Sequence, residues 1–132
     1  MKMKQFPFSL DKIELTFKVN TLAHFWTIKS FLPGMIEQKK GHIVNVASLA
    51  GFSGSPKLVD YCSSKFAAVG LDEALRLEVK HQNLDQYIKT TVICPFYIST
   101  GMFAGVDSKV RYFARWISYW IERTIVPPST NI

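Results

Sequence analysis

One short pattern restricts the folding and chemistry of this chain more than any other: a strand-like run that ends in a serine, followed by a tyrosine and a lysine. The run covers residues 44–48, Tyr61 follows Ser48 by thirteen positions, and Lys65 comes four residues after Tyr61. Residues four apart share a face of a helix, so the phenol and the ammonium can converge on one point. A nearby cation favours the ionised form of a phenol, and a hydroxyl at a strand end can bond to the same substrate oxygen. The pattern predicts a proton-transfer site for an alcohol or a carbonyl.

Length and charge narrow the class of protein. The chain has 132 residues, the length of one domain, and its 48% hydrophobic residues are enough to build a core. Its formal charge of +6 comes from 16 basic and 10 acidic residues, and the basic ones are dispersed. This dispersion argues against a nucleic-acid partner and is consistent with a mild attraction to anionic cofactors or membrane surfaces.

The cysteines and the N-terminus bear on the compartment. Cys62 and Cys94 have neither disulfide-framework nor metal-ligand spacing, and the three histidines do not pair with them. We therefore expect reduced thiols, no metal site and a protein that faces the cytosol. The first residues lack the apolar core of a signal peptide, and no apolar run reaches the roughly 18 residues of a spanning helix.

The first helix is expected to begin at Asp11, which can act as a cap, with Glu14 completing a capping-box pattern. It should run to about Glu37, with a kink or break at residues 32–34. Because it is apolar nearly all round, we expect it to be buried on both sides, with one face on a sheet and the other against a partner.

A strand, a helix and a second strand are expected next. Residues 42–47 are β-branched without alternation, which is typical of a strand covered on both faces of a parallel sheet. A flexible loop is expected at residues 50–56, a helix at 58–80 and a strand at 87–94. This order predicts a right-handed parallel crossover.

Residues 107–126 are expected to form an amphipathic C-terminal helix, with the clearest pattern from residue 110. Its apolar positions recur at helical spacing, and arginines occupy the opposite face. Two interpretations stay open: a helix lying in a membrane interface, or a helix packed over the domain core or the substrate cleft.

The sequence resembles the short-chain dehydrogenase/reductase superfamily. The resemblance is carried by Ser48, Tyr61 and Lys65, by the strand before the serine, and by Asn20 upstream. The signature of this superfamily is a serine on a strand and, after a loop, Tyr-x-x-x-Lys. The resemblance covers roughly residues 10–105. Within the superfamily, residues 19–26 and 99–103 look most like the membrane-associated retinol and 17β-hydroxysteroid dehydrogenases, enzymes of lipid metabolism. This implies a retinoid, a steroid or another lipophilic alcohol as the substrate.

The resemblance implies a role for each matching residue. Tyr61 would be the general acid and base, and Ser48 would hold and polarise the substrate oxygen. Lys65 would assist the tyrosine and bond to the nicotinamide ribose. Asn20 would hold a water that links the lysine to solvent.

The resemblance also implies a nicotinamide cofactor. Pro95, Ile98 and Thr100 match a segment that contacts the nicotinamide in the family, although Phe96 replaces a glycine of that segment. The cofactor would be NAD or NADP, and no matching residue here chooses between them.

The family's glycine-rich turn, which cradles the cofactor pyrophosphate, belongs well upstream of the asparagine, and only nineteen residues precede Asn20. We therefore expect residues 1–132 to form a single truncated short-chain dehydrogenase-like domain. Its fold class would be α/β: a partial Rossmann-like, doubly wound parallel sheet in three layers, lacking the N-terminal βαβ dinucleotide-binding half.

Two functions stay open on these grounds. The first is an NAD(P)-dependent oxidoreductase that interconverts a lipophilic primary or secondary alcohol and its carbonyl. The second is a non-catalytic remnant that associates with a full-length relative or a membrane surface. Either would form a homo- or hetero-dimer through the two long helices, and the expected location is the endoplasmic reticulum membrane or a lipid-droplet surface.

Overall fold

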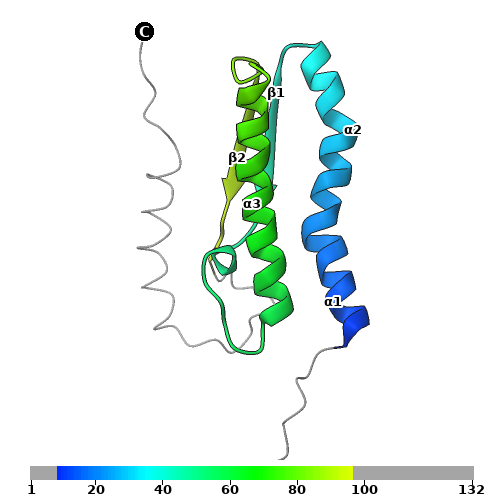
Figure 1. Cartoon of the computed structure of the whole chain (residues 1–132), viewed down its shortest axis with the longest axis vertical. Helices are drawn as coiled ribbons and strands as arrows, with labels where there is room; N and C mark the ends of the chain where they lie inside the picture. The colour runs from blue at the N-terminus through cyan, green and yellow to red at the C-terminus, as the bar shows by residue number, and fades with distance from the viewer. Residues whose placement is uncertain (1–8, 97–132) are drawn as a thin grey trace, which may run out of the picture.

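The computed structural model describes residues 9–96, which form one continuous helical column, a second helix and a two-stranded sheet (Figure 1). In chain order the elements are α1 (Leu10–Phe17), a π-helical segment (Lys18–Leu22), α2 (Ala23–Glu37), β1 (Gly41–Val46), a short 3₁₀ turn (Leu49–Gly51), α3 (Val59–His81) and β2 (Ile88–Ile93). Pro95 and Phe96 follow β2. Ile98, Thr100 and the expected helix at 107–126 lie outside the described residues.

The helical column differs from expectation at its beginning, and it has no break at its proline. The helix begins at Leu10, so Asp11 lies inside the first turn, and Ser9 occupies the cap position without a side-chain capping bond. The expected capping box is therefore wrong: Glu14 instead pairs with Lys18 across one turn at 3.0 Å. The column also continues through Pro33 without a break to Glu37.

The sheet is parallel, and its alternation shows which face is covered. β1 pairs with β2 from Gly41↔Ile88 to Val46↔Ile93. Along β1 the odd-numbered residues turn inward and the even-numbered ones are exposed, with Val44 at 48% and Val46 at 53%. The expectation of a strand covered on both faces is thus wrong for the described residues. They supply the sheet and the helix layer on one of its faces, because α2 and α3 both pack on the same side.

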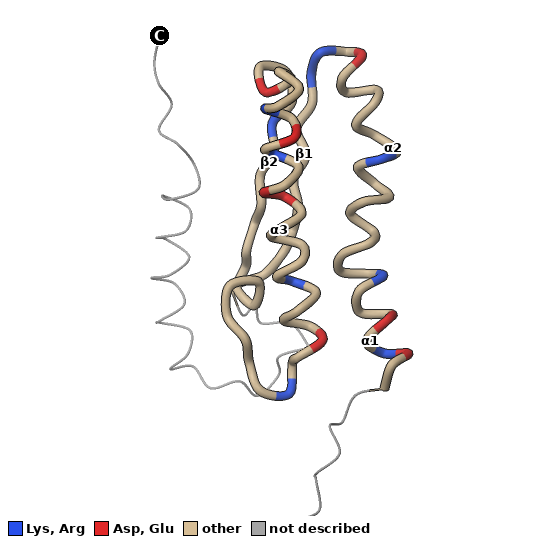
Figure 2. The backbone as a smooth tube through the Cα atoms, in the orientation of Figure 1, with Lys and Arg blue, Asp and Glu red and all other residues tan. Residues whose placement is uncertain are grey.

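Helix α3 joins the two strands and provides most of the core. Its buried residues include Cys62, Ala68, Leu71 and Val79, and Ile88 of β2 is fully buried against this layer. The strand–helix–strand crossover is confirmed, and the observed bounds of the three elements lie within one residue of those expected. Acidic and basic residues are dispersed over the described elements, and the adjacent Lys39 and Lys40 lie between α2 and β1 (Figure 2).

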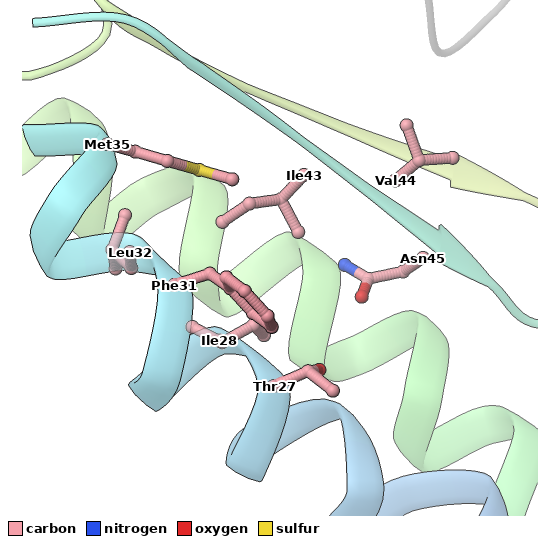
Figure 3. Close-up of a pocket in the computed structure, with 8 residues that line it drawn as sticks. All are labelled: Thr27, Ile28, Phe31, Leu32, Met35, Ile43, Val44 and Asn45. Carbon is pink, nitrogen blue, oxygen red and sulfur yellow. The ribbon is translucent and has the colours of Figure 1, made fainter. Parts of the chain in front are cut away.

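A small hollow of about 130 Å³ separates α2 from β1. Ile43 and Asn45 point into this side of the sheet, while Val44 points away (Figure 3). The residues that line the hollow do not include Ser48, Tyr61 or Lys65.

Candidate active site

Ser48 is held at the carboxyl end of β1 by the ladder to β2. The backbone N–H of Ala47 donates to the Ile93 carbonyl at 2.8 Å, and that of Leu49 donates to the Pro95 carbonyl at 3.0 Å. Ser48 is therefore fixed on both sides in an extended conformation. Its hydroxyl oxygen accepts the N–H of Ala50 at 3.1 Å. Its own proton reaches only the Pro95 carbonyl at 3.5 Å, the limit of a hydrogen bond, so the hydroxyl can still donate elsewhere.

Tyr61 and Lys65 lie one turn apart near the start of α3, and both are half-buried. The Lys65 Nζ lies 5.8 Å from the centroid of the Tyr61 ring. It also donates to the Val46 carbonyl on β1 at 3.4 Å. Burial lowers the pKa of the Lys65 ammonium, and the nearby Cys94 partly opposes this. The lysine Nζ is thus bonded to the strand that precedes Ser48, at a place that water can reach.

Gly51 brings the loop after Ser48 onto the helix of Tyr61 and Lys65. A Cβ at this position would lie 2.7 Å from the Lys65 carbonyl oxygen and 2.7 Å from a methyl group of Val69. Only glycine permits this approach, because the carbonyl belongs to a rigid helix backbone. The expected flexible loop is therefore anchored at its first turn.

Asn20 reaches the site through a neighbour of the lysine. It lies in the π-helical segment, and its Nδ2 donates to the hydroxyl of Ser64 at 3.1 Å. Ser64 in turn donates to the Tyr61 carbonyl at 2.7 Å, and Thr21 donates to the Ser64 carbonyl at 3.0 Å. The structure thus ties Asn20 to the backbone of the Tyr61–Lys65 turn. π-helical segments inside α-helices are frequent at functional sites.

Sequence reasoning missed Ser64, Thr21 and a buried pair, Asn45 and Asp72. The side chain of Ser64 is fully buried, and Asn45 Nδ2 donates to Asp72 Oδ1 at 2.6 Å. One available signal was the position of Asp72, seven residues after Lys65 and so on the same helix face. An acidic residue on the face that contacts the sheet requires a partner.

A cleft of about 400 Å³ lies between the helical column and the start of α3. Most of its exposed surface is apolar, although polar side chains also line it, and its wall includes Asn20 and Tyr61. One polar bridge crosses this region, from the Thr16 hydroxyl to Asp60 Oδ2 at 3.1 Å. The cleft therefore offers an apolar surface beside a phenol.

Comparisons with known proteins identify the family of the chain. Residues 2–111 match the family model described as short chain dehydrogenase. Epidermal retinol dehydrogenase 2 of Homo sapiens is 52% identical over 95 residues, which are 72% of this chain and 30% of that protein. Short-chain dehydrogenase/reductase family 16C member 6 of Bos taurus is 48% identical over 97 residues, which are 74% of this chain and 30% of that protein.

Solved structures give the same family and the same partial extent. A 3-oxoacyl-[acyl-carrier protein] reductase from Brucella melitensis superposes with a TM-score of 0.67 at 31% identity, covering 81% of this chain and 39% of that one. An acetoin dehydrogenase from Enterobacter cloacae superposes with a TM-score of 0.65 at 26% identity, covering 80% and 42%. The expected α/β Rossmann-like fold class is confirmed. The chain spans about 30% of the length of the curated relatives it matches.

Proposed function

The chain belongs to the short-chain dehydrogenase family, and from this premise we propose that it carries the proton-transfer site of an oxidoreductase. The reaction interconverts a lipophilic primary or secondary alcohol, retinoid- or steroid-like, and its carbonyl. The observation that carries the proposal is the attachment of Lys65 beside Tyr61 to the strand that ends in Ser48.

Each side chain has a physical task in this reaction. Tyr61 gives its hydroxyl proton to the substrate oxygen during reduction and takes it back during oxidation. Lys65, held near the ring, stabilises the phenolate that remains. Ser48 donates to the same substrate oxygen, and its weakly engaged proton supports this task. Asn20, bonded to Ser64, holds the turn and, in this proposal, a water between the lysine and solvent.

The residues present fit a nicotinamide cofactor, NAD or NADP. A half-buried ammonium and a phenol one turn apart offer donors to a ribose hydroxyl. Lys65 and Tyr61 would hold the ribose, and Pro95, Ile98 and Thr100 would hold the nicotinamide. When bound, the cofactor accepts or supplies the hydride.

The substrate class rests on two supports. Retinol dehydrogenases from several vertebrates are among the relatives at about half identity, and the cleft beside Tyr61 is largely apolar. Because a lipophilic substrate dissolves in membranes, the proposal also includes a membrane contact. The chain would touch the surface of the endoplasmic reticulum or of a lipid droplet through residues 107–126. Within residues 9–96, no helix is long and apolar enough to span a bilayer.

A second candidate function is favoured by the exposed apolar side chains of the helical column. The helical column exposes Leu15, Val19 and Trp26, each about 60% accessible, and the first two of these also line the cleft beside Tyr61. A non-catalytic chain would use this apolar stripe to associate with a second copy, a full-length relative or a membrane surface.

Cofactor titration separates the two candidates. We expect NADH or NADPH to quench the tryptophan fluorescence of the full chain at micromolar concentration, with retinol turnover followed by the absorbance of reduced nicotinamide. Tyr61→Phe should abolish turnover because it removes only the hydroxyl. Tyr87→Phe is the matched control, since the Tyr87 ring also lies below a lysine, Lys39, at 5.7 Å. Absence of quenching up to millimolar cofactor favours the non-catalytic function.

A further inference from the structure

The pair of Asn45 and Asp72 lies outside the proton-transfer site yet connects the same two elements. Asn45 belongs to β1 and Asp72 to α3, and each is only 5% exposed. The bond between them, at 2.6 Å, is short and shielded from water. Carboxyl groups are almost never this buried without a partner.

The position of the pair determines what it can control. Asn45 comes three residues before Ser48 and directly before Val46. The Val46 carbonyl accepts the hydrogen bond from Lys65 Nζ. Asp72 lies two helical turns after Lys65 on the same face of α3. The Lys65–Val46 bond is long and lies where water can compete, whereas the Asn45–Asp72 bond is buried. The buried bond is therefore the firmer link between the strand of Ser48 and the helix of Tyr61.

The charges around the pair make Asn45 difficult to replace. Burial raises the pKa of Asp72, and the amide of Asn45, then Arg76 and His24, act in the opposite direction. His24 of α2 faces the pair. Burial and then Lys65 lower the pKa of His24. Its Nδ1 has no hydrogen-bond partner among residues 9–96. Cys94, after β2, also lies close enough to interact with Asp72 and Lys65. Without Asn45, the carboxyl of Asp72 loses its hydrogen-bond donor from β1, which favours a shift of α3 that admits water.

We propose that Asn45 and Asp72 are positioning residues that hold α3 against β1, so that Lys65 and Tyr61 stay in register with Ser48. The meaning of this register for catalysis rests on the proposed function. The burial of Lys65 that it maintains can be measured without turnover.

The test follows the environment of Lys65 by competitive acetylation of the full chain with acetic anhydride across a range of pH, read by mass spectrometry. Exposed Lys29 serves as an internal standard. Asn45→Val removes the donor while leaving a strand-forming side chain. The double variant Asn45→Asp with Asp72→Asn restores the bond with donor and acceptor exchanged and keeps the net charge. Val79→Ala shortens another buried side chain of α3 and controls for general loss of stability.

In Asn45→Val we expect the reaction midpoint of Lys65 to move to higher pH, because the lysine becomes solvated. Its reactive fraction just below the midpoint should fall about threefold, as a shift of half a pH unit requires. The exchanged pair should return the midpoint to the wild-type position, and Val79→Ala should leave it there. If Asn45→Val does not fold, Asp72→Leu takes its place. It should give the same upward movement, opposite to the direct effect of removing a negative charge near a lysine.

An unchanged Lys65 profile in the folded single variants, or a shift that the exchanged pair does not correct, overturns the proposal. Turnover and cofactor quenching are measured on the same samples. If the wild type neither binds cofactor nor turns over retinol, the proposed function fails, while the pattern of Lys65 profiles still decides whether the pair positions α3.

Discussion

The two sides of α3 are built by different means. Toward β1 and the turn after it, the helix is fixed by two polar contacts, Lys65 to Val46 and Asp72 to Asn45, and by the close approach of Gly51 to the helix backbone. The helical column on the other side contacts α3 through Asn20 and Thr21 but turns much of its apolar surface outward. A proton-transfer site requires fixed atoms, whereas an apolar stripe can bind a partner with little directional constraint. The first side therefore suits the proposed proton transfer, and the second suits association with a partner.

Gly51→Ala should have the largest effect on this comparison, because it attacks the fixed side directly. The added methyl group would meet the Lys65 carbonyl at 2.7 Å, and the loop after Ser48 would have to move. We expect a loss of about 1–3 kcal/mol in the free energy of unfolding, the usual result of overpacking. Urea denaturation measures this loss. Gly54→Ala is the control, since nothing lies within 4 Å of its added carbon. Equal stability of the two variants would contradict the close packing of the loop.

Ser64→Ala tests the contact between α3 and the helical column. It removes the acceptor of Asn20 Nδ2 inside a fully buried position. We expect a loss of about 1–2 kcal/mol in the free energy of unfolding, because a donor is left without a partner. Ser63→Ala should cost far less, since the hydroxyl of Ser63 is exposed and bonds only within its own helix. Similar losses in both variants would show that Asn20 is not held by Ser64.

The dependence of stability on pH probes the buried pair on the fixed side. Burial raises the pKa of Asp72, so the folded state holds this proton more tightly than the unfolded state. Its stabilising contribution is present below the ordinary carboxyl pKa and is lost as pH rises through the raised value. Asp72→Asn should remove this decline, whose slope for one proton is at most about 1.4 kcal/mol per pH unit. Unfolding by urea at a series of pH values measures it.

His24 affects the same dependence of stability on pH in the opposite direction, and its effect forms the acidic arm of the curve. Burial, and then Lys65, lower the pKa of His24 below its ordinary 6.5, so the folded state binds its proton less tightly. Its contribution is lost as pH falls from 6.5 through the lowered value. His24→Gln should flatten this arm. It should leave the arm from Asp72 in place but move it to higher pH, because His24 no longer opposes the raised pKa of Asp72. As a control for both arms, exposed Asp85→Asn should follow the wild type. A wild-type shape in Asp72→Asn or His24→Gln would contradict the assigned burial.

Trp26→Gln should have the smallest effect on stability, within about 0.5 kcal/mol, because its side chain is 59% exposed. It should nevertheless reduce self-association of the full chain, measured by sedimentation velocity, if the apolar stripe of Leu15, Val19 and Trp26 binds a second copy. Lys29→Gln, on the same helix and also exposed, is the control. Unchanged association in Trp26→Gln would remove the stripe from the interface.

The two strand-like runs, the helical pattern between them and the Tyr-x-x-x-Lys spacing were sufficient to locate both strands, α3 and the three side chains of the proposed site. The cap at Asp11 was predicted wrongly because a local pattern of Asp and Glu does not decide where the first helical bond forms. The burial of both faces of the first strand was also inferred from composition alone, and Val44 and Val46 are exposed among the described residues. Apolar residues on a strand show that a face can be covered, and tertiary packing decides whether it is.

By itself, the sequence determined which residues can approach one another along a helix or follow one another along a strand, since helical and extended backbones have fixed periods. For Tyr61 and Lys65, this helical period was enough to predict that they lie on one face of a helix. Only the tertiary structure decided that Asn45 meets Asp72 and that Asn20 bonds to Ser64, across 27 and 44 residues of chain. Such pairs depend on how two surfaces dock, and docking is governed by the sum of many weak contacts that no short stretch of sequence contains.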